Sequence, residues 1–352
     1  MRPNRVRPVA GTRRFARTGR GRVAFGQFAL QTVPRAADTS REPLLHVRSR
    51  VGSARARGHP TMTRRSSHSL LLPAIVLFGA FALVFLSARG SRPPAPSASY
   101  SMGHGPTIVL VHGLGSRIEH WLPVARKLAR THRVILAELP GHGESAMTEP
   151  LTLERAAAAL EGTLARETRE PVTLVGHSVG GLVAAKLALD RPRLVRALVL
   201  IETSLKPAMD ERERLGLLDQ LDSDYRALVE GAYTSYGSDS SQGRKLAAEA
   251  ETQDPKNLKP WIRLALTADL SAAAGELRLP VVAALSDRTW PRDESWPACA
   301  KELGYERIPQ VEPVRFEGTG HFVMLDRPTD LARLIARVAG GEGEIVGASK
   351  RR

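Results

Sequence analysis

Short apolar runs alternate with segments of helical periodicity through most of the chain after residue 106. The runs are rich in Val, Ile and Leu and have the length of strands buried on both faces. The predicted strands span residues 107–112, 133–137, 171–175, 195–201, 280–285 and 311–316, and the predicted helices span 119–130, 153–168, 179–190 and about 328–338. This alternation predicts an α/β fold with a mostly parallel central sheet flanked by helices.

The alternation stops between residues 204 and 274, where the chain is charged, carries scattered Leu and has no convincing strand. This stretch leaves the carboxyl end of the predicted strand 195–201. Ligands of parallel sheets bind beyond that end of the strands. We therefore predict a helical cap over the site, with a purely decorative surface insertion as the alternative. The core then comprises residues 106–203 and 275–342, and residues 343–352 form a tail.

A different pattern precedes the predicted sheet. Residues 70–86 contain no charged side chain and are flanked by Arg on both sides. This pattern is typical of a signal peptide or signal anchor within residues 62–89, with a transmembrane helix at about 70–88. We expect a membrane-anchored or secreted protein whose folded part lies outside the cytoplasm. Residues 90–105 are rich in Pro, Ser and Gly, which predicts a linker.

A net charge of +15 would ordinarily suggest a nucleic-acid partner. The distribution of this charge along the chain argues against that interpretation. Residues 1–69 hold sixteen Arg, no Lys and two acidic residues, whereas the rest carries 35 basic and 34 acidic residues. We therefore expect the folded part to bind no nucleic acid. The predicted signal peptide or signal anchor is complete from Met62 onward, with a short basic segment before the apolar run. Residues 1–61 are then either a basic disordered arm for acidic lipid or nucleic acid, or a leader absent from the mature protein, which we favour.

Cysteine and histidine usage limits the chemistry further. Cys299 is the only cysteine, so no internal disulfide can form. The chain has no CxxC or HExxH motif and no Cys/His cluster, so neither a metal nor another cofactor is expected.

The sequence GHSVG at residues 176–180 directly follows a predicted strand and opens a predicted helix. A serine in this context lies on a strained turn, and Gly176 and Gly180 are needed because side chains there would collide as strand and helix approach. We predict that Ser178 is a nucleophile on this elbow.

A serine nucleophile needs a base and two donors for the oxyanion. His321 lies on a Gly-flanked loop after the last predicted strand, which agrees with the order serine, acid, histidine and predicts the base. One oxyanion donor is the backbone N–H of Val179, and the other is expected from the loop after the first predicted strand, at Leu114.

Four segments carry a family resemblance: HGLGSRIEHW, ELPGHGES, GHSVGG and GTGHFVMLDRP. Together they resemble the α/β-hydrolase superfamily over roughly residues 104–340. The resemblance implies the α/β-hydrolase fold, Ser178 as nucleophile, His321 as base, and Leu114 and Val179 as oxyanion donors. A serine at the elbow argues against haloalkane and epoxide hydrolysis, which in this superfamily use an aspartate nucleophile.

The third member of the triad departs from the family pattern. The family usually places its acid a few residues after the strand equivalent to 280–285, where this chain has Thr289. Asp287 lies two residues earlier and is the favoured acid. Glu202, at the end of the predicted strand 195–201, is the rival, and Asp293 and Glu294 are outside candidates.

These features predict a serine hydrolase that cleaves a small acyl-containing substrate, a carboxylic ester, through an acyl-enzyme. One alternative is a peptidase, thioesterase or C–C bond hydrolase with the same triad. Another is a non-catalytic binding protein of the same fold. The sequence leaves the oligomeric state open.

Overall fold

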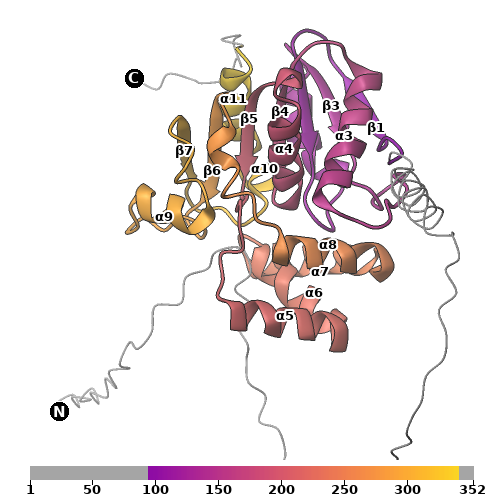
Figure 1. Ribbon diagram of the computed structural model, residues 1–352, viewed down its shortest axis with the longest axis vertical. Coiled ribbons are helices and arrows are strands. Elements are labelled where there is room, and N and C mark those ends of the chain that lie inside the picture. The colour runs from indigo at the N-terminus through magenta and orange to yellow at the C-terminus, as the bar shows by residue number, and fades with distance from the viewer. Residues whose placement is uncertain (1–93, 341–352) are drawn as a thin grey trace, which may run out of the picture. The chain divides into compact units, whose positions relative to one another are not determined.

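The computed structural model describes residues 94–340, which form a seven-stranded sheet in the order β1-β3-β2-β4-β5-β6-β7 (Figure 1). The strands are β1 (Ser99–Met102), β2 (Thr107–Val111), β3 (Arg133–Ala137), β4 (Val172–His177), β5 (Val195–Ile201), β6 (Val281–Ser286) and β7 (Val311–Phe316). All neighbours pair in parallel except β1, which is antiparallel to β3. The predicted α/β class and the mostly parallel sheet are confirmed.

Helices cover both faces of the sheet because alternate strand residues point to opposite sides. In β2, Val109 and Val111 join the apolar cluster that includes residues of α3 and α4, whereas Ile108 and Leu110 join the cluster with α2 and α11. The helices and short 3-10 turns of the core are η1 (Ile118–Trp121), α2 (Leu122–Leu128), α3 (Leu153–Glu167), α4 (Val179–Asp190), η2 (Pro192–Leu194), η3 (Ala274–Glu276), α9 (Trp296–Leu303), α10 (Val323–Asp326) and α11 (Pro328–Val338).

The segment between β5 and β6 is a helical insertion, as the loss of strand pattern predicts. It contains α5 (Glu211–Ser223), α6 (Tyr225–Tyr236), α7 (Ser240–Glu251) and α8 (Pro255–Thr267). Asp210, Asp224, Asp239 and Asp254 cap the four helices, each accepting a hydrogen bond from a backbone N–H of the first turn. Figure 1 shows the four helices gathered below the sheet, and we call them the cap.

One predicted boundary needs correction. Residues 99–102 belong to β1 rather than to a linker, because their backbone pairs with the otherwise open edge of β3. The side chain of Ser145 also accepts a hydrogen bond from the N–H of Ala98 at 2.8 Å. An edge strand of this length has too few apolar positions to be distinguished from a Ser-rich linker by pattern alone.

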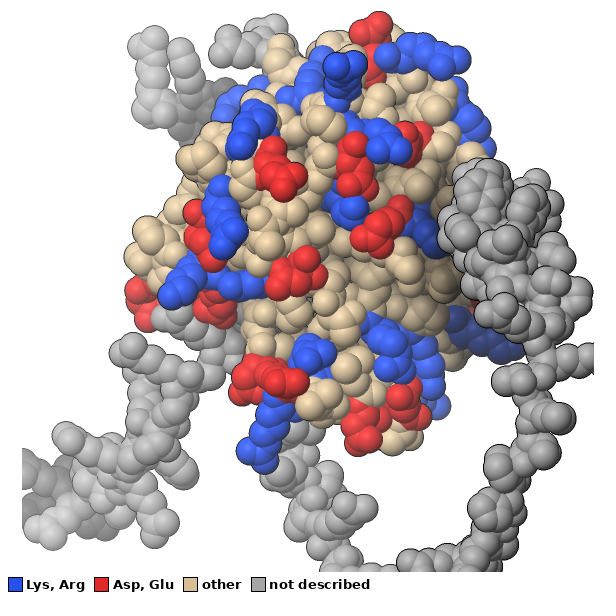
Figure 2. Space-filling view, in the orientation of Figure 1, with Lys and Arg blue, Asp and Glu red and all other residues tan. Residues whose placement is uncertain are grey.

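Three predicted segments lie outside the described residues: the leader at 1–61, the signal region at 62–89 with its transmembrane helix at 70–88, and the tail at 343–352. Within residues 94–340, no helix has both the length and the apolar character needed to cross a membrane. Figure 2 shows basic and acidic side chains interspersed over the visible face of this part of the molecule. Cys299 is buried.

Candidate functional site

Ser178 occupies a sharp turn between β4 and α4. Its φ of 55° and ψ of −126° are unusual for a residue with a side chain. A Cβ at Gly176 would collide with the carbonyl oxygen of Gly180, and a Cβ at Gly180 would collide with the carbonyl oxygen of His112. Only glycine fits at either position. The strand and helix therefore approach closely enough to present the serine on an elbow.

His321 lies on the loop between β7 and α10, and its backbone is held on two sides. Its N–H donates to the carbonyl oxygen of Tyr236 at 2.8 Å, and its carbonyl oxygen accepts from Nε2 of His177 at 2.9 Å. The Tyr236 ring stacks on the imidazole of His321 with a centroid distance of 4.5 Å. Burial holds the pKa of His177 well below its ordinary value, so His177 is a neutral donor. Its Nε2 proton is therefore used in the hydrogen bond to the carbonyl oxygen of His321.

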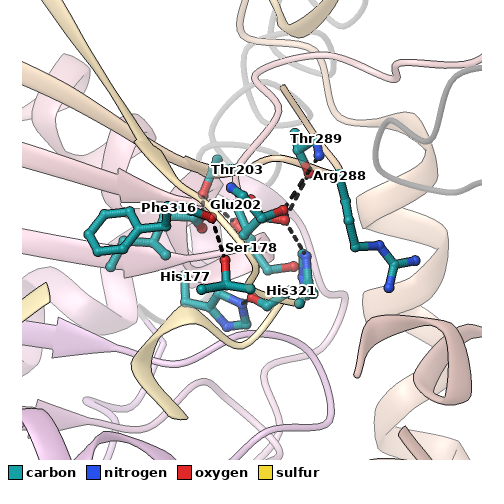
Figure 3. Close-up of polar contacts among 12 residues, drawn as sticks. His177, Ser178, Glu202, Thr203, Arg288, Thr289, Phe316 and His321 are labelled. Atoms are coloured by element: carbon teal, nitrogen blue, oxygen red, sulfur yellow. Dashed lines mark hydrogen bonds and ion pairs between the residues drawn. The ribbon is translucent and has the colours of Figure 1, made fainter. Parts of the chain in front are cut away.

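Glu202 follows β5 directly, with a φ of 48°, and its side chain is 2% exposed. Its Oε2 lies 3.2 Å from Nδ1 of His321, and Figure 3 shows the carboxylate directed at the imidazole. The same carboxylate accepts hydrogen bonds from the N–H of Ser286 at 2.5 Å and from Oγ1 of Thr289 at 2.8 Å. These donors offset the desolvation of a buried carboxylate.

The two candidate acids therefore have different surroundings. Asp287 is partly exposed, and its Oδ2 accepts a hydrogen bond from the N–H of Gly318 at 3.2 Å. The geometry favours Glu202 over Asp287, contrary to the preference drawn from the sequence. Asp293 and Glu294 lie on the loop before α9. In the sequence, Thr289 stands out only as an interruption of the family pattern, whereas in the structure its hydroxyl contacts the Glu202 carboxylate.

Two backbone segments lie beside Ser178, at the positions where the sequence predicts the oxyanion donors. Val179 is the first residue of α4, where helix N–H groups have no partner within the helix. On the other side, a Cβ at Gly113 would lie 3.1 Å from Cβ of Ser178, so the turn at residues 113–116 begins against Ser178. We call these four residues the oxyanion loop. Leu114, within this loop, lines the same cavity as Ser178.

The cavity next to Ser178 is lined mostly by side chains of the cap. Its volume is about 50 Å³, which leaves room for a small group. None of the lining side chains is Asp, Glu, Lys or Arg. The lining comprises Leu114, His177, Ser178, Leu228, Val229, Ala232, Tyr233, Tyr236, Ile262, Ala265, Leu266, His321 and Phe322. Helices α6 and α8 supply most of the apolar wall.

Among residues 94–340, no group of three or more His, Cys, Asp or Glu side chains is arranged to hold a metal ion.

Comparisons with known proteins agree with this architecture. The model of the "Alpha/beta hydrolase family" matches residues 108–334. The pimeloyl-[acyl-carrier protein] methyl ester esterase of Yersinia pseudotuberculosis serotype IB (strain PB1/+) is 27% identical over 257 residues, which cover 68% of this chain and 96% of that protein. The enzyme of the same name from Chromobacterium violaceum is 30% identical over 249 residues, covering 67% of this chain and 95% of its own.

A solved structure shows the same fold. A hydrolase from Oleispira antarctica superposes with a TM-score of 0.62 at 18% identity, over 70% of this chain and 95% of its own. At this identity the likeness concerns the fold alone.

Proposed function

Because the chain belongs to the alpha/beta hydrolase family, we propose that it hydrolyses carboxylic esters through an acyl-enzyme formed on Ser178. One observation carries the proposal. Ser178 shares a cavity with His321, and Nδ1 of that histidine lies 3.2 Å from the buried carboxylate of Glu202. This is the arrangement in which a base is oriented by an acid behind it.

The proposed reaction runs in two halves. His321 takes the proton from the Ser178 hydroxyl as the oxygen attacks the ester carbonyl, and the Glu202 carboxylate stabilises the imidazolium that forms. The N–H groups of Leu114 and Val179 hold the oxyanion of the tetrahedral intermediate. His321 then gives its proton to the departing alcohol. In the second half, a water activated by His321 attacks the acyl-enzyme, and Ser178 regains its proton as the acid leaves.

The cavity supports an uncharged, apolar and short acyl group. Its wall contains no charged side chain, so a carboxylate or ammonium on the acyl group would lose its hydration without gaining a partner. The names of the relatives, methyl ester esterases, support ester hydrolysis as the reaction type.

Fluorophosphonate labelling of the full chain tests this proposal. The probe should label the wild-type protein and fail to label Ser178→Ala. Ser241→Ala, an exposed serine on α7, should label like the wild type. Wild-type protein without the probe should hydrolyse p-nitrophenyl acetate and butyrate faster than the decanoate or the succinate half-ester. A folded wild-type protein that neither labels nor hydrolyses these esters would overturn the proposal.

The apolar run at residues 70–86 supports a second, independent part of the proposal, that the hydrolase is anchored at a membrane or secreted. Fractionation of expressing cells checks this. Release of all the activity by cell lysis without detergent would contradict an anchor, and absence of activity from the medium would contradict secretion. The two results together would overturn this part of the proposal.

A further inference from the structure

The oxyanion loop makes a tight turn. The N–H of Ser116 donates to the carbonyl oxygen of Gly113 at 3.2 Å, and Gly115 has a φ of 58°. Leu114 keeps the negative φ of an ordinary residue. A positive φ at the third position of such a turn is typical of type II geometry. The peptide between Leu114 and Gly115 is the one that reverses its direction when a type II turn becomes type I.

Hydrogen bonds hold both polar groups of this central peptide. The hydroxyl of Tyr233, on cap helix α6, donates to the carbonyl oxygen of Leu114 at 2.6 Å. The N–H of Gly115 donates to Nε2 of His142 at 3.1 Å. The carbonyl and N–H of one peptide point in opposite directions, so a flip would break both hydrogen bonds at once.

The two partners hold fixed roles as donor and acceptor. Tyr233 is buried, and burial raises its pKa well above the ordinary value, so its hydroxyl keeps the proton. Burial lowers the pKa of His142 to about 4, so the ring is neutral at physiological pH. Nδ1 of His142 lies 3.3 Å from the carbonyl oxygen of Pro140 and donates its proton there, which leaves Nε2 as the acceptor.

Further contacts hold the flanking peptides of the same turn. Nδ1 of His112 donates to the carbonyl oxygen of Gly113 at 2.8 Å, and this peptide also contains the N–H of Leu114. Nε2 of Gln253, between cap helices α7 and α8, donates to the carbonyl oxygen of Gly115 at 2.7 Å. The core therefore holds the first peptide of the turn, and the cap holds the carbonyl oxygens of the next two.

We infer that Tyr233 is a positioning residue for the oxyanion hole, through which the cap keeps the Leu114 N–H aimed at the reacting oxygen. This inference rests on the proposed function and deepens it. A flip of the Leu114–Gly115 peptide alone would leave the Leu114 N–H in place, so the cap acts by holding the turn as a whole against Ser178, through the carbonyl oxygens of Leu114 and Gly115. The cap thus contributes to stabilising the transition state in addition to forming the wall of the cavity.

Removal of the Tyr233 hydroxyl in the full chain tests the inference. In Tyr233→Phe, kcat for p-nitrophenyl butyrate should fall about 10-fold, less than the loss of a whole oxyanion donor, which costs about 100-fold or more. KM should stay within about twofold, because hydrogen bonds to the oxyanion strengthen as the transition state forms. The affinity for a boronic acid that forms a tetrahedral adduct with Ser178 should fall by the same factor as kcat/KM.

Tyr225→Phe is the matched control. Tyr225 begins the same helix, its buried hydroxyl has no hydrogen-bond partner among the described residues, and its side chain is absent from the cavity wall. Its kcat should remain within about twofold of wild type. Gln253→Met removes the second hydrogen bond from the cap to the turn, and it should also lower kcat. This variant tests the inference if Tyr233→Phe does not fold.

The outcomes separate the two proposals. An unchanged kcat in a folded Tyr233→Phe protein would overturn the inference, as would a rise in KM with constant kcat, which would mark Tyr233 as cavity wall only. If the wild-type protein neither hydrolyses the esters nor reacts with the probe, the proposed function itself would be overturned.

Discussion

Oε2 of Glu202 lies 3.2 Å from Nδ1 of His321 although the two residues are 119 positions apart. The contact is possible because β4 and β5 are adjacent and end together, with the N–H of Ser178 donating to the carbonyl oxygen of Ile201 at 2.9 Å. Ser178 and Glu202 thus immediately follow neighbouring strands, each with a positive φ. His321 comes from the C-terminal part of the chain, contacts Glu202 and lines the same cavity as Ser178.

Replacing the carboxylate should identify the acid. Glu202→Gln keeps the shape but removes the charge that stabilises the imidazolium, so kcat should fall by roughly 10²–10⁴. Asp287→Asn is the control and should stay within about threefold, since an amide oxygen can still accept the hydrogen bond from Gly318. Steady-state kinetics on p-nitrophenyl butyrate measures both. A large loss in Asp287→Asn alongside a near-normal Glu202→Gln would return the role to Asp287.

Thr289 should tune the same carboxylate. Its hydroxyl donates to Oε2 of Glu202 at 2.8 Å, the oxygen that faces His321. Thr289→Val removes this donor while keeping the shape, and kcat should fall by about 3- to 10-fold, a loss of about 0.7–1.4 kcal/mol that is on the scale of one ordinary hydrogen bond. Thr289→Ser should restore most of the rate. If the valine variant matches wild type, the hydrogen bond has no part in orienting the acid.

The elbow glycines should be needed for folding as well as for presenting the serine. A Cβ at Gly180 would collide with a backbone oxygen of His112, so Gly180→Ala should lower the free energy of unfolding by about 2 kcal/mol or more. At Gly216, on helix α5, an added Cβ would meet no other atom within 4 Å. Gly216→Ala should therefore stabilise the protein by about 0.5–1 kcal/mol. Urea denaturation compares them, and equal effects would argue against the steric account.

Acid should destabilise the fold through its buried histidines. The pKa of His142 is lowered by burial to about 4 in the folded protein, against about 6.5 when unfolded. Between these values the unfolded state binds more protons, so stability is complete above pH 6.5 and decreases as the pH falls toward 4. This one residue should account for roughly 3 kcal/mol over that range.

His142→Gln should reduce the slope of unfolding free energy against pH, measured by urea denaturation between pH 7 and pH 4. The exposed His104 offers the control, since His104→Gln should leave the slope unchanged. A slope that is the same in all three proteins would mean that His142 does not titrate across folding.

Sequence patterns were sufficient to predict the strands, most of the core helices and the position of the elbow. These features depend on local rules: a run of apolar β-branched residues, a helical spacing, and the steric demand of GHSVG at a strand-to-helix turn. The predicted strands 133–137, 195–201 and 311–316 have the same bounds in the structure. Local patterns fail for β1, because only pairing with β3 makes four mostly polar residues a strand.

The carboxylate that faces His321 and the contacts of the cap emerged only from the three-dimensional arrangement. Both Asp287 and Glu202 follow strands of the sheet, and the pattern along the chain does not encode which of them reaches the histidine. The hydrogen bond from Tyr233 to Leu114 likewise joins residues 119 positions apart. Such contacts arise from how strand ends and cap helices meet in space, and this depends on packing over the whole core rather than on the residues adjacent to each group.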